Sequence, residues 1–293
     1  MTRTRDTILV TGARGQLGAE LVAALAPFGK VTALDRASLD LTDADAIVRV
    51  VRNAAPAWIV NAAAYTAVDR AEREPARAFA INARAPRILA EEAKRIGAML
   101  VHYSTDYVFD GAQRTPYDEA SPTNPLNVYG ASKLEGEHAI AASGASALTL
   151  RTSWVYGLRG ANFLLTIRRL AAERDVLRIV DDQTGVPNWT RSLAGATAAL
   201  MARGRAAVAE RAGLYHLCAS GSTTWYGFAC AIVGNAPKPK IVPIATADYP
   251  LPAPRPAYAV LDTARIRDAF GVALPDWRDV LAACLAGPAE PPE

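Results

Sequence analysis

The sequence predicts an α/β fold, in which a doubly wound parallel sheet is followed by a smaller, irregular C-terminal α/β lobe. Three observations support this prediction. Short apolar runs typical of strands alternate with helical stretches over the first half of the 293 residues, as they do in βαβ units. A glycine-rich turn follows the first apolar run. Prolines break the second half into short pieces, which interrupts regular helices and strands.

The first half of the chain is expected to contain five strands and the helices between them. Apolar and β-branched side chains predict strands at residues 7–11, 31–34, 58–60, 99–103 and 147–151. Helices are expected at residues 19–25, 45–53, 76–96 and 129–142, with Pro86 as a local irregularity. Right-handed crossovers between these strands give a parallel sheet. We therefore place a Rossmann-like domain at residues 1–156. The smaller lobe, with segments that return to the first domain, is expected at residues 157–293.

Composition and charge exclude several classes of protein. The chain is 51% hydrophobic and carries a formal net charge of +3, which argues against intrinsic disorder and against nucleic-acid binding. Three cysteines argue against a disulfide framework. His102, His138 and His216 are too far apart in sequence for metal-ligand spacing and are interpreted as structural. No apolar run suits a signal peptide or a membrane span, so a cytoplasmic protein that binds no membrane is expected.

A glycine-rich turn lies directly between the first strand and the first helix. It places Gly12, Gly15 and Gly18 at the spacing Gly-x-x-Gly-x-x-Gly. Glycine permits a tight turn and close approach of the backbone to a pyrophosphate. The helix N-terminus adds free N–H groups and a positive dipole end. The turn therefore predicts a dinucleotide phosphate site, which also includes Gln16 and Leu17.

Further contacts to the dinucleotide are expected beyond the second strand. Asp35 ends this strand, where a carboxylate can accept hydrogen bonds from the adenosine ribose. Arg36 follows it and Arg14 lies in the glycine turn, so either cation could instead bind a 2′-phosphate. NADH and NADPH therefore both stay open. Asp40 and Leu41 could flank the adenine, although ordinary helix capping explains this segment equally well.

Small and polar residues follow the third and fourth strands. The small side chains of Ala62, Ala63 and Ala64 would let a cofactor pass close to the backbone. Thr105 ends the fourth strand, at the sheet edge where doubly wound folds place their ligands. Its hydroxyl could donate a hydrogen bond to a substrate carbonyl, or it could serve only as a strand-end cap.

Tyr129 and Lys133 stand four residues apart on an expected helix. This spacing puts both side chains on one face. A tyrosine with an ordinary pKa of about 10 is a poor acid–base group at neutral pH, and a neighbouring ammonium lowers that pKa. Lys133 could also hold the nicotinamide ribose hydroxyls. Taken alone, the pair is also common on ordinary helix faces.

Several longer stretches carry a resemblance to a known family. They are residues 15–18, 61–69, 104–111, 127–133, 151–157 and 181–187. With the glycine turn, Thr105, Tyr129 and Lys133, these stretches resemble the dTDP-4-dehydrorhamnose reductase family of extended short-chain dehydrogenases/reductases. The resemblance runs from about residue 7 to about residue 285, and the blocks at residues 65–69 and 182–183 are specific to this family.

The resemblance implies an oxidoreductase that uses NADPH or NADH to reduce the 4-keto group of dTDP-4-dehydro-β-L-rhamnose. The product, dTDP-L-rhamnose, serves cell-surface polysaccharide synthesis. By this resemblance Tyr129 donates the proton, Lys133 lowers the pKa of Tyr129 and binds the cofactor ribose, and Thr105 hydrogen-bonds the sugar carbonyl. The residues expected to bind the dTDP-sugar are Thr105, Asp106, Tyr129, Trp154, Asn162 and Arg255.

Two of these substrate roles are more specific. Trp154 is expected to pack on the sugar, because an indole offers an apolar face to sugar C–H groups. Arg255 is expected to approach the nucleotide-sugar, where it could pair with the diphosphate. Some members of the family dimerise through a magnesium site of glutamates. Those glutamates have no match in this chain, so we expect no metal, while a homodimer stays open.

Departures from the family pattern keep alternatives open. Ala259 replaces a serine and Asn188 replaces a commoner threonine, which leaves the nucleotide or the sugar open. Another nucleotide-sugar 4-ketoreductase or an epimerase of the same family therefore stays an alternative, as does a non-catalytic NADP-binding regulatory subunit. A dehydratase is disfavoured, because Tyr107 stands where its second carboxylate would follow Asp106. Retention of Thr105, Tyr129 and Lys133 together favours catalysis over a binding role.

Overall fold

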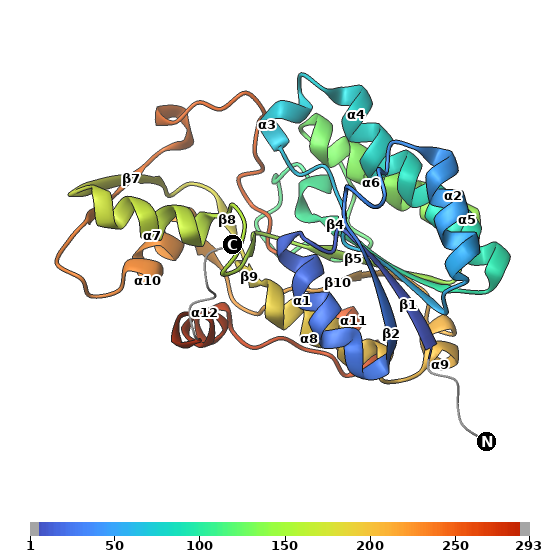
Figure 1. The fold of residues 1–293 in the computed structure, drawn as a ribbon. Coiled ribbons are helices and arrows are strands. Elements are labelled where there is room, and N and C mark those ends of the chain that lie inside the picture. Colours follow the sequence, from blue (N-terminus) through green and yellow to red (C-terminus); the bar gives the residue numbers. More distant parts are fainter. Residues whose placement is uncertain (1–5, 288–293) are drawn as a thin grey trace.

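A computed structural model describes residues 6–287, and a six-stranded sheet forms the centre of this part of the chain (Figure 1). The strand order is β10-β5-β4-β3-β1-β2, with all neighbours parallel. The strands are β1 (Asp6–Thr11), β2 (Gly29–Leu34), β3 (Trp58–Asn61), β4 (Met99–Thr105), β5 (Ala147–Thr152) and β10 (Gly213–His216). Because the chain reverses direction across the sheet between β2 and β3, the carboxyl ends of β1 and β3 flank the point where such sheets bind ligands. The expected doubly wound α/β fold is confirmed.

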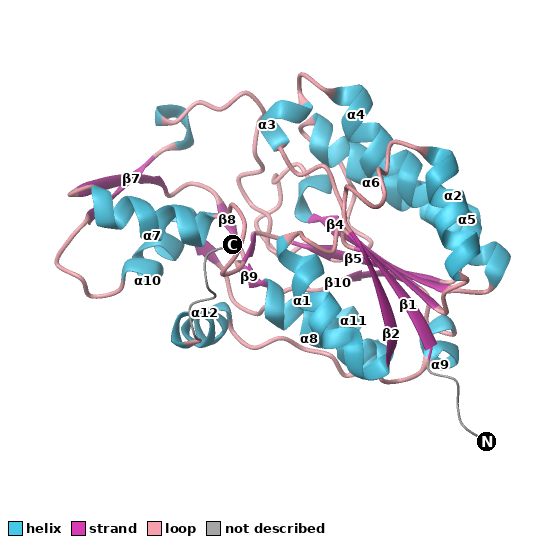
Figure 2. Ribbon diagram, in the orientation of Figure 1, coloured by secondary structure: helices cyan, strands magenta, loops and turns pink. Residues whose placement is uncertain are grey.

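Helices cover both faces of the sheet (Figures 1 and 2). One face carries α2 (Ala44–Ala54), α5 (Ala85–Ile96) and α6 (Val128–Ser143), and the other carries α1 (Gln16–Leu25), α8 (Thr190–Met201) and α11 (Ala264–Phe270). The strand side chains alternate accordingly: Leu9 and Leu100 belong to the core under α2 and α5, whereas Val10 and Val101 belong to the core under α1 and α8. All four are buried, as expected for a parallel sheet covered on both sides.

The long helix expected at residues 76–96 is present but interrupted. It consists of α4 (Pro75–Phe79), the π-helical turn η2 (Ala80–Arg84) and α5. Pro86 lacks an N–H and cannot continue the ordinary helix hydrogen bonds across this turn. The π turn presents buried Asn82, whose side chain bonds the backbone N–H and C=O of Tyr65 and the hydroxyl of Ser132. The irregularity thereby ties the loop after β3 to α6.

The chain beyond residue 157 contributes to both the sheet and a separate layer. β10 and α8 return to the sheet, whereas α7 (Phe163–Glu173), α10 (Trp225–Val233) and α12 (Trp277–Ala286) build a lobe to one side (Figure 1). The lobe has its own core around Tyr156, Phe228 and Trp277. Its short strands are β6 (Val155–Tyr156), β7 (Val176–Val180), β8 (Thr184–Gly185), β9 (Asn188–Trp189), β11 (Thr223–Thr224) and β12 (Lys240–Ile244).

Short helical elements complete the described chain. They are η1 (Ala26–Phe28), α3 (Val68–Ala71), η3 (Asp106–Val108), α9 (Arg205–Ala209) and η4 (Thr246–Asp248). None of the helices within residues 6–287 combines the length and apolarity needed to cross a membrane.

Candidate active site

A cavity of about 910 Å³ lies at the carboxyl ends of the sheet strands, between the sheet and the lobe. The predicted cofactor residues that line it are Gly12, Gly15, Gln16, Leu17, Asp35, Arg36, Asp40, Leu41, Ala62, Ala63, Ala64, Tyr129 and Lys133. The predicted substrate residues that line it, besides Tyr129, are Thr105, Asp106, Trp154 and Asn162. Gly18 and Arg255 lie outside the lining. The structure thus brings together, in one cavity, residues that are up to 150 positions apart in sequence.

The glycine turn has the geometry that a pyrophosphate requires. Gly12 has a φ of 68°, and a Cβ there would lie 2.8 Å from the backbone of Ala63. Gly18 packs against the turn, since a Cβ there would lie 2.0 Å from the carbonyl oxygen of Gly12. Gly15 is the N-cap of α1, and among the described residues no side chain caps this helix. Its first N–H groups are therefore available to an anion, and the turn fits a dinucleotide.

The rim of the cavity beyond β2 carries one carboxylate and two cations. Asp35 Oδ1 accepts hydrogen bonds from the backbone N–H groups of Ala37 and Ser38 and from the Ser38 hydroxyl. Arg14 Nε lies 3.0 Å from Asp35 Oδ2. These contacts, those of Ser38 first, lower the pKa of Asp35. A charged Asp35 suits a ribose hydroxyl, while Arg14 and Arg36 offer positive charge to a 2′-phosphate.

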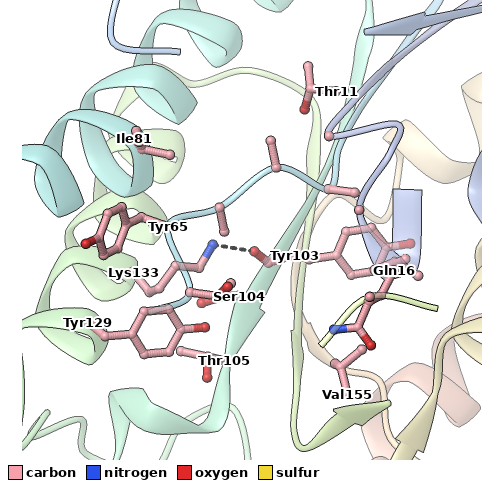
Figure 3. A pocket seen from close by; sticks show the side chains of 18 of the residues that line it. Thr11, Gln16, Tyr65, Ile81, Tyr103, Ser104, Thr105, Tyr129, Lys133 and Val155 are labelled. Atoms are coloured by element: carbon pink, nitrogen blue, oxygen red, sulfur yellow. Dashed lines mark hydrogen bonds between the residues drawn. The ribbon is translucent and has the colours of Figure 1, made fainter. Parts of the chain in front are cut away.

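Tyr129 lies in the first turn of α6, with its hydroxyl beside that of Thr105 (Figure 3). The Asn127 side chain caps this helix by accepting a hydrogen bond from the N–H of Gly130. The cap fixes where the helix begins and therefore where Tyr129 lies. Burial raises the pKa of Tyr129 to about 12, and the hydrogen bond with Thr105 opposes this shift. The expected lowering of this pKa by Lys133 stays a prediction. Tyr129 therefore carries its proton at neutral pH, as a proton donor must.

Lys133 is buried and held by the sheet. Its Nζ donates to the carbonyl of Tyr103 at 2.6 Å and lies 3.2 Å from Nε2 of His102 (Figure 3 shows the first contact). Thr11, Asn61 and His102 occupy one register row across β1, β3 and β4 and are joined by hydrogen bonds of 2.6 and 2.9 Å. Burial lowers the pKa of Lys133 to about 8. The hydrogen bonds from Thr11 through Asn61 hold the His102 imidazole in place, and His102 in turn positions the Lys133 ammonium.

Trp154 forms the lobe side of the cavity together with Trp225, a residue that sequence reasoning missed. The two indoles stack with centroids 3.5 Å apart and planes 7° apart. Trp154 has a φ of 41°, in the left-handed region that residues other than glycine rarely occupy. A Cβ on Gly185 would lie 2.5 Å from the Trp154 ring, so glycine is needed there. Trp225 also donates from Nε1 to Gln183 at 3.2 Å.

Two predicted substrate residues have structural partners. Arg255 forms a two-bond ion pair with Asp69, at 2.6 and 2.7 Å, and it joins the strap around residue 255 to α3. Arg255 lies outside the cavity lining, and its expected contact with the diphosphate stays a prediction. Asn162 caps α7 through Leu165 N–H and also donates to Gln16 Oε1 at 2.8 Å. It thereby connects the lobe to the glycine turn.

The described residues show no group of three or more His, Cys, Asp or Glu side chains placed to hold a metal ion. His102 and His216 are fully buried, and each is hydrogen-bonded.

Comparisons with known proteins place the chain in a family. A family model described as the RmlD substrate binding domain matches residues 6–289. The chain belongs to this family. Two relatives named dTDP-4-dehydrorhamnose reductase, from Burkholderia thailandensis and Escherichia coli K12, are 50% and 44% identical. These alignments cover 95% and 92% of this chain, and 97% and 94% of the relatives. The resemblance predicted from the sequence is confirmed.

A solved structure extends the comparison to three dimensions. The dTDP-4-dehydrorhamnose reductase from Bacillus anthracis, in complex with NADP, is 34% identical and superimposes with a TM-score of 0.90. The match covers 96% of this chain and 99% of that one. The sheet and the lobe are thus parts of an architecture that this chain shares with that structure.

Proposed function

We propose that the chain reduces the 4-keto group of dTDP-4-dehydro-β-L-rhamnose to a hydroxyl, giving dTDP-L-rhamnose, with NADPH or NADH as the reductant. The observation that carries this proposal is the cavity itself. Thr105, Tyr129 and Lys133 line the same cavity as the Gly12–Gly15 turn, which suits a pyrophosphate. The relatives that match nearly the whole chain are named for this reaction.

The side chains have distinct roles in the proposed reaction. The nicotinamide supplies the hydride that the sugar C4 accepts. Tyr129 donates its phenolic proton to the oxygen as the C=O bond becomes C–O, so that a hydroxyl forms. The Thr105 hydroxyl donates a hydrogen bond to the same oxygen and stabilises its developing charge. The Lys133 ammonium holds the nicotinamide ribose and stabilises the Tyr129 phenolate that remains.

The lobe is proposed to hold the dTDP-sugar. The Trp154–Trp225 stack offers an apolar wall to the sugar, while Asp106 and Asn162 supply polar atoms near it. We assign residues 1–156 to the cofactor domain and residues 157–293 to the sugar-nucleotide lobe, with β10 and α8 returning to the sheet. A cytoplasmic location is proposed, because that compartment supplies nicotinamide cofactors and nucleotide sugars. A homodimer stays open as the assembly.

An absorbance assay tests the reaction directly. The purified chain is given NADPH or NADH in separate reactions, with dTDP-4-dehydrorhamnose generated in place, and loss of the reduced nicotinamide absorbance is followed. The proposal expects one cofactor oxidised for each sugar reduced. An epimerase would change the sugar without net oxidation, because it returns the hydride. A regulatory subunit would bind cofactor and oxidise none. No oxidation with either cofactor would overturn the proposal.

A further inference from the structure

Asp106, directly after Thr105, is a carboxyl group buried at the reacting end of the cavity. It is 2% exposed and lines the cavity. Its Oδ1 accepts a hydrogen bond from the Thr105 hydroxyl at 2.9 Å. Its Oδ2 is buried and has no hydrogen-bond partner within the described residues. A buried carboxylate with an unpaired oxygen is costly, so this environment favours the neutral acid.

The ionisable groups that face Asp106 do not offset this cost. They are Tyr107 on η3, Tyr129 on α6 and Cys218 just after β10. Each of these groups is uncharged when protonated and negative when ionised, so none of them supplies a positive charge that would stabilise an ionised Asp106. Burial raises the pKa of Asp106 to about 7, and the Thr105 hydroxyl and nearby backbone N–H groups oppose the shift only in part. Both protonation states are therefore accessible under working conditions.

The protonation state of Asp106 decides where the single hydrogen of Thr105 points. When Asp106 is ionised, it can only accept, so the Thr105 O–H is directed at Oδ1. The Thr105 oxygen already accepts from the Tyr107 N–H at 3.2 Å. In that state Thr105 has no hydrogen to offer to a substrate carbonyl.

A neutral Asp106 reverses this hydrogen bond. The carboxyl O–H donates to Thr105 Oγ1, and the Thr105 hydrogen becomes free. Thr105 then accepts from two donors, the Tyr107 N–H and the Asp106 carboxyl, which matches its two lone pairs. Hydrogen bonds that run in one direction along such a chain strengthen one another.

We propose that Asp106 is a positioning residue that works as a neutral acid, donating to Thr105 so that the Thr105 hydroxyl points at the substrate carbonyl. The inference rests on the proposed reduction and adds a pH dependence to it. Ionisation of Asp106 removes one of the two hydrogen bonds to the developing alkoxide. The hydride-transfer rate therefore falls as the pH rises through the pKa of Asp106.

The test compares the single-turnover rate of NADPH oxidation at pH 6.5 and pH 8 in the parent and in Asp106→Asn. The amide of the variant donates to Thr105 but does not titrate. We expect the parent rate to fall by roughly an order of magnitude, because Asp106, with a pKa of about 7, and Lys133, with a pKa of about 8, both lose protons over this range. In Asp106→Asn we expect the rate to fall only roughly twofold. This remaining fall comes from deprotonation of Lys133, whose pKa is about 8.

A double-variant comparison shows whether Asp106 acts through Thr105. In a Thr105→Val background, Asp106→Asn should no longer change the ratio of the two rates, because the hydroxyl that Asp106 orients is absent. NADPH binding, followed by fluorescence, verifies that each variant folds. An Asp106→Asn variant with the parent's pH dependence would overturn the inference, as would one that binds NADPH but has lost all activity, since the charge would then be required. A parent inactive at every pH would instead overturn the proposed function.

Discussion

Lys133 and Asp106 are buried, and they line the cavity at the carboxyl ends of the strands together with the partly exposed Tyr129. Burial raises the pKa of Tyr129 to about 12 and lowers the pKa of Lys133 to about 8. Because the pKa of Tyr129 is raised, the tyrosine stays protonated at neutral pH. This is the state that reduction of a ketone needs, since the tyrosine must give a proton and not take one.

Replacement of Tyr129 by phenylalanine removes the proton donor and little else. We expect the rate of reduction to fall roughly 10²–10⁴-fold, the usual contribution of a general acid, while the dissociation constant of NADPH changes little. Steady-state kinetics and fluorescence titration measure the two quantities. The matched control is Tyr156→Phe, because the Tyr156 hydroxyl is buried without a hydrogen-bond partner in residues 6–287 and lies outside the cavity lining. Parent-like turnover in Tyr129→Phe would show that another group donates the proton.

Single residues also show what the sequence could and could not predict. The meeting of Thr105, Tyr129 and Lys133 in one cavity was predictable, because each position depends on a local signal, a strand end or one helical turn. Their roles are implied only by the family resemblance. Trp225 was not, because it meets Trp154 only after the lobe folds, 71 residues further along the chain. Nor was the pairing of Arg255 with Asp69, which depends on where a proline-rich strap lies in space.

At the scale of elements, the turn between β1 and α1 is shaped by contacts that leave no room for a side chain. Gly18 is in the first turn of α1 and presses on the carbonyl of Gly12. This contact sets the angle at which α1 leaves the sheet and therefore where its free N–H groups point. The proposed phosphate site thus depends on two elements packed together, and the glycine spacing was enough to predict the tight turn between them.

Alanine at position 18 tests this packing. A Cβ there would lie 2.0 Å from the Gly12 oxygen, so the turn must shift. We expect Gly18→Ala to weaken NADPH binding about tenfold or more and to lower the free energy of unfolding by about 1–3 kcal/mol. The control is Gly195→Ala in α8, where a Cβ meets nothing within 4 Å. That variant should gain up to about 1 kcal/mol. Equal NADPH affinity in Gly18→Ala and the parent would contradict the role given to this glycine.

At the scale of the whole molecule, a buried polar cluster joins α6, β5 and β10 beneath the site. Arg151 and Glu137 form a two-bond ion pair at 2.9 and 2.7 Å, and both are buried. His216 Nε2 lies 3.5 Å from Arg151 Nη1, and His216 Nδ1 lies 3.0 Å from the carbonyl of Asp262. A neutral ring donates from Nδ1 and leaves Nε2 free to accept. Burial, and then Arg151, lower the pKa of His216 to about 3.

This histidine predicts a loss of stability in mild acid. The unfolded chain protonates His216 below about pH 6.5, whereas the folded chain resists until far lower pH, so acid favours the unfolded state. We expect the free energy of unfolding to fall by about 2 kcal/mol from this group between pH 7.5 and pH 5. Urea titrations measure it. His216→Gln should flatten the dependence by that amount, and exposed His138→Gln should not. An unchanged slope in His216→Gln would refute the assignment.

The overall architecture was predictable to different degrees in the two halves of the chain. The five strands and four helices expected up to residue 151 are present, because apolar runs and helical periodicity are local signals. The return of β10 to the edge of β5 was expected only in general terms. Its partner and register depend on a chain of about 60 residues folding elsewhere first, which no local pattern in the sequence encodes.

The central claim, that this cavity transfers a hydride to C4 of a dTDP-linked sugar, has one direct test. The chain is incubated with dTDP-4-dehydrorhamnose and NADPH that carries deuterium at the transferable position of the nicotinamide, and the product is examined by NMR spectroscopy. The account predicts dTDP-rhamnose with deuterium at C4 and an equal amount of oxidised cofactor. Product without deuterium at C4, or sugar conversion with no oxidised cofactor released, would contradict it.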